Sequence, residues 1–108
     1  KEFIAFLKDA GATAVHMRSA SPLYKYPCHY GINTNSVADE LAARKFAGKN
    51  DEATIENIRA FIEADTLGYL SLEASKRAII EGGCLKLKPH NFCDACFSGW
   101  YHIPIKPL

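Results

Sequence analysis

The chain places two cysteines at a spacing that suits shared chemistry, in the run CDACFSG at 93–99. Thiols separated by two residues, as in Cys93 and Cys96, can turn toward one point and bind zinc or an iron–sulfur cluster, or act as a redox dithiol. A third cysteine, Cys28, lies far upstream in the run YPCHYG. Only folding can bring it to the same point. The pattern therefore predicts a metal or iron–sulfur centre that fastens the end of the chain to its middle.

The surroundings of Cys93 and Cys96 leave several chemistries open. A redox dithiol is typical of a strand-to-helix junction, whereas this pair follows Pro89 in a segment without regular periodicity. Four cysteines also permit disulfides, but no secretory signal is present, so reduced thiols, some of them bound to metal, are favoured. Inert buried thiols remain the alternative, because a free cysteine often behaves as a small hydrophobic residue.

Other potential ligands lie nearby in the sequence. Cys84 is a candidate fourth ligand or, alternatively, a free cysteine after a helix end. His90 and His102 flank the cysteine pair and are candidate zinc ligands. By contrast, His16 alternates on a predicted strand and is expected to be a core or hydrogen-bonded residue. His29 is expected to point away from the neighbouring thiol.

No complete catalytic apparatus is predicted in this chain. Its carboxylates fall at predicted helix starts and on helix faces, where caps and solvated surfaces explain them, and Asp65 is expected to form a turn. The sequence contains no Ser–His–Asp set, Gly-rich phosphate loop or paired acidic motif.

Composition limits the classes of partner. The 108 residues fit one domain, and 48% hydrophobic content argues against disorder. The net charge is +1 and the lysines are scattered, so we expect no nucleic-acid partner. No apolar run reaches the roughly 18 residues of a membrane span, so we expect no membrane partner. The chain begins without Met inside a predicted helix, and we therefore expect a piece of a longer protein.

The cysteines must be positioned by the elements around them. Residues 19–35, which include Cys28, lack any period and form a predicted long loop, a feature that is often functional. Before it, apolar spacing predicts a helix at 3–7, and a buried strand is predicted at 12–17. The order helix, glycine turn and buried strand indicates an α/β fold.

Regular elements are also predicted after the loop. Helices are expected to start at Ser36 and at Asp51, with Asp51 as the cap of the second. A strand at 67–70 leads to a helix at 72–81. We expect Ser71 to cap that helix and a glycine pair to end it. From residue 84 onward the chain is predicted to be an irregular tail, except for a short element at 100–103.

Four segments together resemble one protein family. They read VHMRSASP, YPCHYGI, ADTLGYLSLE and CDACFSG, at 15–22, 26–32, 64–73 and 93–99. Their order and content are similar to the C-terminal quarter of amidophosphoribosyltransferase, over about residues 1–101. The resemblance implies that 1–108 form the C-terminal portion of a phosphoribosyltransferase domain, a parallel sheet with flanking helices. Residues 84–108 would be its cluster-binding tail. Because a parallel sheet needs its missing strands, we do not expect the piece to fold alone.

The resemblance also implies a function for the full-length protein, a glycosyltransferase of the first step of de novo purine biosynthesis. Members of the family release ammonia from glutamine in an N-terminal domain with a cysteine nucleophile. The ammonia displaces pyrophosphate from phosphoribosyl pyrophosphate (PRPP) to give 5-phosphoribosylamine. The glutaminase domain and the PRPP loop, which binds Mg²⁺, are absent from this chain. We therefore expect the chain alone to be inactive and the full protein to be a cytoplasmic homo-oligomer.

The resemblance further implies a 4Fe-4S cluster, with Cys28, Cys93 and Cys96 as three of its four ligands. The fourth ligand of the family lies upstream of this sequence, and Cys84 matches no ligand position. Three positions depart from the family pattern, namely Leu23, Asn33 and Ala74. At position 33 an amide replaces the family's carboxylate, which either removes charge-dependent contacts near the active site or is neutral in a turn.

Two other classes of protein fit the same residues. One is a small zinc-binding interaction module that uses Cys28, Cys93 and Cys96 with either Cys84 or a histidine. The other is a scaffold domain with buried thiols and no metal. Metal content separates the three hypotheses, since iron favours the first, zinc the second and no metal the third.

Overall fold

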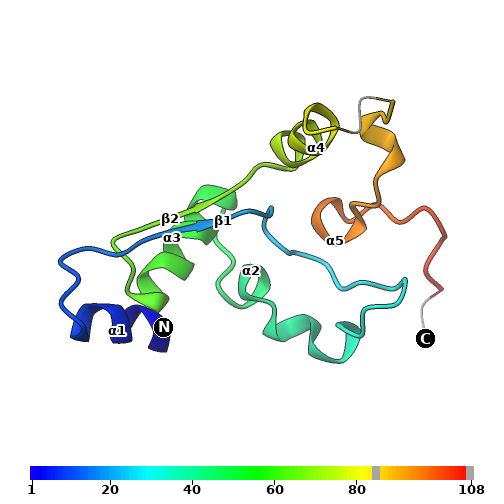
Figure 1. Cartoon of the computed structure of the whole chain (residues 1–108). Coiled ribbons are helices and arrows are strands. Elements are labelled where there is room, and N and C mark those ends of the chain that lie inside the picture. Colours follow the sequence, from blue (N-terminus) through cyan, green and yellow to red (C-terminus); the bar gives the residue numbers. More distant parts are fainter. Residues whose placement is uncertain (84–85, 107–108) are drawn as a thin grey trace.

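The computed structural model describes residues 1–83 and 86–106 of the chain. Helices and strands are mixed along it, and β1 and β2 form a small parallel sheet (Figure 1). This agrees with the predicted α/β class. In order, the elements are α1 (Glu2–Asp9), β1 (His16–Ser19), η1 (Asn35–Glu40), α2 (Ala42–Lys45), α3 (Asp51–Ile62), β2 (Thr66–Tyr69), α4 (Leu72–Glu81), η2 (Pro89–Asn91) and α5 (Ala95–Ser98).

Strands β1 and β2 pair in parallel with their first residues opposite each other. His16 lies opposite Thr66, and Ser19 lies opposite Tyr69. Just before the strands, the Val15 N–H donates to Asp65 Oδ2 at 2.7 Å, and the Asp65 N–H donates to the Val15 carbonyl at 2.9 Å. Asp65, predicted to form a turn, therefore also ties the two strands together.

The first strand is shifted from its predicted position. A buried strand was expected at 12–17, but β1 begins at His16, and of the residues at 12–17 Val15 is the one that is buried. The pairing with Asp65 explains the shift, because Val15 and Asp65 exchange two hydrogen bonds and the paired strands start at the next residue of each segment. His16 is exposed, yet its Nδ1 lies 2.9 Å from Thr66 Oγ1, so the hydrogen-bonded alternative for this residue is confirmed and the core alternative is wrong.

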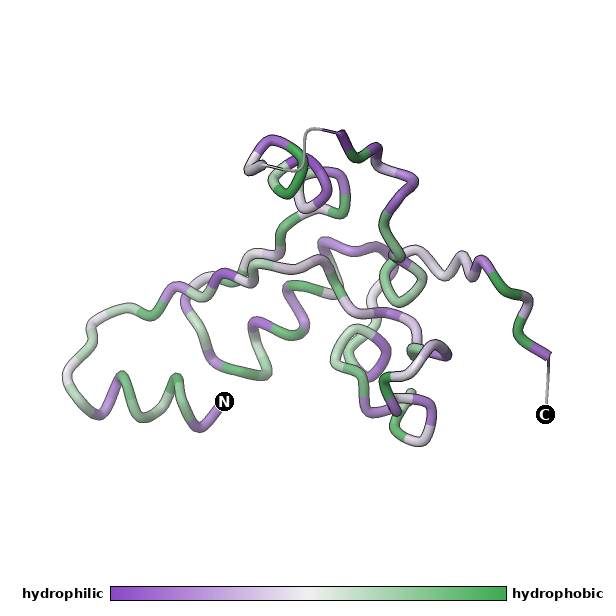
Figure 2. Tube along the Cα trace, turned by 45° about the vertical axis from the view of Figure 1, so that its right-hand side comes forward, coloured by the Kyte–Doolittle hydropathy of each residue, from purple (hydrophilic) through white to green (hydrophobic). Residues whose placement is uncertain are grey.

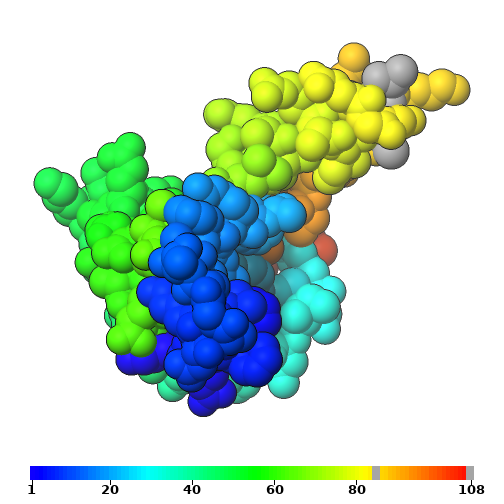
Figure 3. Space-filling model, turned by 60° about the vertical axis from the view of Figure 1, so that its left-hand side comes forward, coloured from blue at the N-terminus to red at the C-terminus, as the bar shows by residue number. Residues whose placement is uncertain are grey.

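A small core lies between the first helix and the sheet. Ile4 of α1, Val15 and Ala64 form its buried cluster, against which Leu7 and Ile62 pack. Apolar residues occur in every part of the trace, however, and many large ones are exposed (Figure 2). Helix α4 projects from the body formed by α1, β1 and α3 (Figure 3). The fold is therefore open, with a radius of gyration of 16.2 Å, against about 13 Å for a compact domain of 100 residues.

One of the two predicted helix caps is confirmed and the other is wrong by one residue. Ser71 caps α4 as predicted, and its hydroxyl accepts from the Ala74 N–H at 3.1 Å. Helix α3 is capped by Asn50, whose Oδ1 accepts from the Ala53 N–H at 2.8 Å. The prediction that Asp51 is the cap was wrong by one residue, because Asn50 has extended backbone whereas Asp51 is already helical.

Two segments contain different structure from that expected. The helix predicted to start at Ser36 is a 3₁₀ helix, η1, followed by the short α2, and the chain is extended at Leu41 between them. The tail is less irregular than predicted, since it contains η2 and α5. Residues 100–103, all of them described, form no regular element.

The cap of α3 gives a local test of the fold. Replacing Asn50 with Ala removes the acceptor for the Ala53 N–H and should cost about 1 kcal/mol. Hydrogen exchange in the first turn of α3 should then be about fivefold faster, as that free energy implies. The Asn50→Ser variant retains a capping oxygen and serves as the control. Equal exchange in Asn50→Ala and the parent protein would contradict this role.

The pairing of Asp65 predicts a dependence of strand pairing on pH. The Val15 N–H, with smaller contributions from Lys8 and His16, holds the pKa of the Asp65 carboxyl below its ordinary value. The resulting stabilisation is complete above pH about 4, the ordinary pKa, and is lost as the pH falls through the lower folded pKa. The protection factors of the β1 amide protons, which are exchange rates measured by NMR and corrected for the intrinsic effect of pH, should therefore fall in acid. Asp65→Asn should flatten this dependence, and an unchanged pH profile would contradict it.

Candidate metal centre

The loop that carries Cys28 and the turn that carries Cys93 and Cys96 lie side by side (Figure 1). The Lys25 and Tyr26 N–H groups both donate to the Cys96 carbonyl at 3.0 Å. These hydrogen bonds join two segments that are distant in the sequence. The predicted approach of the middle of the chain to its cysteine-bearing tail is therefore present in the structure.

The tail beyond the turn is also attached to this loop. The Tyr101 hydroxyl donates to the Pro27 carbonyl at 2.6 Å, and the Ile103 N–H donates to the Tyr30 hydroxyl at 3.0 Å. The Tyr101 ring packs edge-on against His29 and Tyr30, with centroid distances of 5.0 and 5.9 Å. Residues on both sides of Cys28 thus hold the tail.

Two residues of the CDACFSG run explain part of this packing. The Phe97 ring lies edge-on to Tyr24, at 6.1 Å between centroids. Gly99 ends α5 with a φ of 79°, and a Cβ at this position would lie 2.9 Å from the Tyr26 ring. A side chain at Gly99 would therefore be strained and would also push the Cys28 loop away from the turn.

Backbone N–H groups surround the sulfur of Cys28. The N–H groups of Ile32, Tyr30 and Gly31 lower the pKa of the Cys28 thiol, and the distance from Tyr30 N to Sγ is 3.4 Å. The φ of 136° at Gly31 allows the loop to curl in this way, which favours glycine there. Donors of this kind stabilise a thiolate, the form of cysteine that binds metals.

The Cys96 thiol is in the opposite electrostatic situation. Burial raises its pKa, and the neighbouring Cys28, Cys93 and Asp94 raise it further. Cys96 lies half-buried in α5, while Cys93 is exposed. Negative charge at these neighbours therefore disfavours the thiolate form of Cys96, and a bound cation would favour it.

Among the described residues, the remaining candidate ligands form no metal-binding group with the cysteines, and one candidate lies outside these residues. Cys84 lies outside them. His90 and His102 line a pocket with Phe92 and Trp100, and His102 packs edge-on against Trp100 at 4.3 Å. His29 makes a hydrogen bond of 2.9 Å with Asn35. In residues 1–83 and 86–106, no three His, Cys, Asp or Glu side chains form a group that could hold a metal ion.

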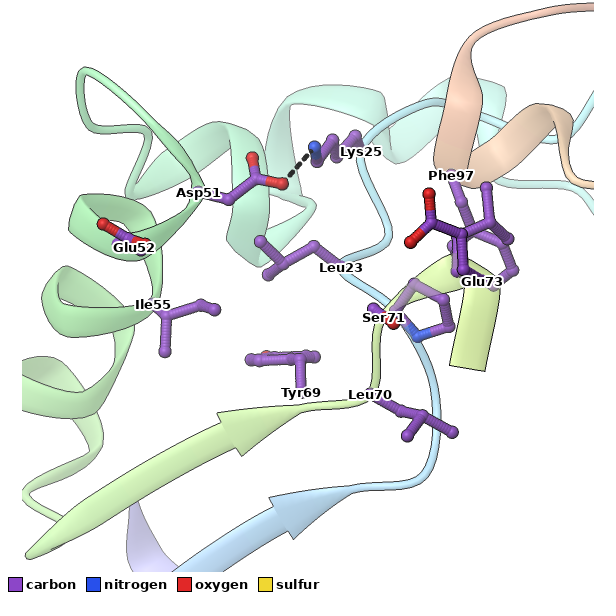
Figure 4. A pocket seen from close by; sticks show the side chains of 12 residues that line it. Leu23, Lys25, Asp51, Glu52, Ile55, Tyr69, Leu70, Ser71, Glu73 and Phe97 are labelled. Atoms are coloured by element: carbon purple, nitrogen blue, oxygen red, sulfur yellow. Dashed lines mark hydrogen bonds and ion pairs between the residues drawn. The ribbon is translucent and has the colours of Figure 1, made fainter. Parts of the chain in front are cut away.

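A second feature is a pocket of about 590 Å³ near the carboxyl ends of β1 and β2 (Figure 4). Pockets of α/β proteins commonly lie at this edge of the sheet. Lys25 and Asp51 form an ion pair of 2.7 Å in its wall. The lining also includes Leu23, one of the three expected departures from the family pattern, and Phe97 of α5. Residues of the sheet and of the cysteine turn thus line the same pocket.

The other two departures lie outside this lining. Asn33 is exposed in the loop, and Ala74 is half-buried on α4. Both positions agree with the sequence analysis, which predicted a loop at 19–35 and a helix at 72–81. Among the described residues, no helix is both long and apolar enough to cross a membrane.

Known proteins match nearly all of the chain. Amidophosphoribosyltransferase of Synechocystis sp. is 38% identical over 105 residues, and that of Mycobacterium leprae is 40% identical over 105 residues. Amidophosphoribosyltransferase 2, chloroplastic, of Arabidopsis thaliana is 36% identical over 106 residues. The chain is related to amidophosphoribosyltransferases. These matches confirm the predicted resemblance.

The relationship covers one segment of amidophosphoribosyltransferase. The matches include 97–98% of this chain, but the chain spans only 16–18% of the length of these relatives. No model of a known protein family matches the chain. The segment related to amidophosphoribosyltransferase includes Cys28, Cys93 and Cys96, whose role as ligands stays a prediction.

The bond between Tyr101 and Pro27 gives a test of tail attachment. Tyr101→Phe keeps the ring contacts with His29 and Tyr30 but removes the donor to the Pro27 carbonyl. The loss should cost about 1 kcal/mol and make proteolytic cleavage within the tail about fivefold faster. Tyr69→Phe, a hydroxyl loss away from the tail, is the matched control. Equal cleavage of Tyr101→Phe and the parent protein would show that this bond does not hold the tail.

Proposed function

We propose that the chain is the C-terminal part of an amidophosphoribosyltransferase, a glycosyltransferase of purine biosynthesis. The observation that carries this proposal is the similarity of nearly the whole chain to curated enzymes of that name. The parallel pairing of β1 and β2 and the pocket near their carboxyl ends are compatible with part of a phosphoribosyltransferase sheet.

In the full-length protein, glutamine would supply ammonia and PRPP would accept it. The new bond joins the ammonia nitrogen to C1 of the ribose, and the bond from C1 to the pyrophosphate oxygen breaks. The products are 5-phosphoribosylamine and pyrophosphate. We assign the residues of this chain to the fold around that reaction.

The chain would depend on the rest of the same polypeptide for its stability. Its core is small, and Phe3, Phe6 and Ile32 are each about two-thirds exposed. Burial of such side chains contributes about 1.5–3 kcal/mol each. We infer that further strands and helices of the longer protein cover them, and that the complete enzyme assembles as a homo-oligomer.

We also propose that Cys28, Cys93 and Cys96 hold three corners of a 4Fe-4S cluster, with the fourth ligand outside this chain. The backbone N–H groups around the Cys28 sulfur fit a bound thiolate, and the hydrogen bonds from Lys25 and Tyr26 to the Cys96 carbonyl bring the Cys28 loop beside the turn that carries the other two cysteines. When bound, the cluster supplies thiolate–iron bonds that crosslink the loop to the tail. We assign it a structural role.

Metal analysis of the full-length protein tests this assignment. Protein prepared without oxygen should contain about four irons per chain and form phosphoribosylamine from glutamine and PRPP. Cys28→Ser and Cys93→Ser should lose most of the iron, whereas Cys84→Ser should keep it, because Cys84 matches no ligand position. One zinc per chain would instead support the interaction module, and the absence of metal would support a cluster-free scaffold.

Exposure to oxygen tests the structural role separately. As the visible absorbance of the cluster bleaches, protease cleavage between residues 84 and 108 should increase before cleavage elsewhere. The loop and tail would then lose their covalent link while keeping hydrogen bonds such as that between Tyr101 and Pro27. A tail that stays protected after bleaching would refute the structural role.

A further inference from the structure

An ion pair connects helix α4 to the cysteine turn. Lys76 Nζ of α4 contacts Asp94 Oδ2, and each side chain is 16% exposed. In every other ion pair of the described residues, both side chains are at least 30% exposed. Lys76–Asp94 is therefore the pair most removed from water in this part of the chain. Removing either member would leave the other charge partly desolvated and unpaired.

Asp94 also determines the shape of the turn between Cys93 and Cys96. Its Oδ1 accepts from the Ser98 hydroxyl at 2.8 Å, and its carbonyl accepts from the Phe97 and Ser98 N–H groups, each at 2.8 Å. All three oxygens of Asp94 are thus engaged. Because Lys76 fixes the carboxylate, it indirectly fixes the turn that carries the two cysteines.

The charge of Lys76 matters in addition to its position. Cys93 and Cys96 flank Asp94, so a bound cluster would put thiolate charge on both sides of a carboxylate. Like charges held together are unfavourable, and the lysine supplies a compensating positive charge at the carboxylate itself. A neutral residue at position 76 would remove this compensation.

Helix α4 connects the cysteine turn to the sheet. It follows β2 directly, its first turn is capped by Ser71, and its residues Leu72 and Glu73 line the pocket near the strand ends (Figure 4). Phe97, from α5, lines the same pocket. The turn is therefore connected to the sheet through α4 as well as to the Cys28 loop.

We propose that Lys76 and Asp94 are positioning residues that hold the Cys93–Cys96 turn in the shape that presents its thiols to the proposed cluster. They would affect the cluster by fixing the position of the two cysteines, and they would not contact the metal. This inference rests on the proposed cluster and adds to it a residue pair outside the ligand set. The pair would therefore slow the release of iron, compared with a protein that has the same cysteines but lacks the pair.

The test measures iron release from the full-length protein to a chelator without oxygen, followed by visible absorbance. Lys76→Ala and Asp94→Asn should each release iron about tenfold faster than the parent protein, a typical coupling for contacting charges. Lys76→Arg should release it near the parent rate. The exchanged pair, Lys76→Asp with Asp94→Lys, should be slower than Lys76→Asp alone. Arg77→Ala, on the same helix but exposed, should have no effect.

Circular dichroism and the cysteine variants separate the outcomes. If Lys76→Ala does not fold, Lys76→Arg and Asp94→Asn decide, because both nearly preserve side-chain size. Parent-like iron release from folded Lys76→Ala or Asp94→Asn overturns the positioning role while leaving the cluster proposal intact. Equal acceleration by Arg77→Ala also overturns it, since the effect would then be general destabilisation. A parent protein without iron overturns the cluster and the positioning role together.

Discussion

The structure around the cysteines depends on one backbone carbonyl. The Cys96 oxygen accepts hydrogen bonds from both Lys25 and Tyr26 at 3.0 Å, and these are the bonds that set the tail against the middle of the chain. They involve only backbone atoms, so they do not depend on which side chains stand at these three positions. The ring contacts of Tyr101 and the curled loop at Cys28 follow from that approach.

Different forces hold the two ends of the molecule. Near the start of the sheet, apolar burial of Ile4 and Val15 combines with the exchange of hydrogen bonds between Val15 and Asp65. Around the cysteines, Leu23 and Ala95 are the buried apolar residues, and hydrogen bonds, edge-on rings and the Lys76–Asp94 pair join the segments. A region with so little core gains most from crosslinks, which limit the conformations of the unfolded chain. A metal that crosslinks the chain would therefore stabilise the region around the cysteines more than the region at the start of the sheet.

Local signals could be predicted from the sequence, whereas distant pairings could not, apart from the approach of the Cys28 loop to the cysteine turn. Ser71 was identified as a cap because a cap depends on a few neighbouring residues. Asn50 and Asp51 are adjacent residues with similar capping ability, so the sequence could not decide between them. The shift of β1 came from Asp65, fifty residues away from Val15. At the site, the three cysteines could be identified from the sequence. The tyrosine contacts and the Lys76–Asp94 pair depend on tertiary structure and carry no local signal.

The two-stranded sheet has a consequence for handling the protein. Within the residues described, β1 pairs only with β2, so each strand presents one edge whose N–H and C=O groups lack a neighbouring strand. Met17 on β1 and Leu70 just beyond β2 add exposed apolar surface. Edges of this kind act as templates for other strands. A polypeptide limited to these residues would therefore satisfy its edges by association with copies of itself, and its solubility would report on whether those edges are covered.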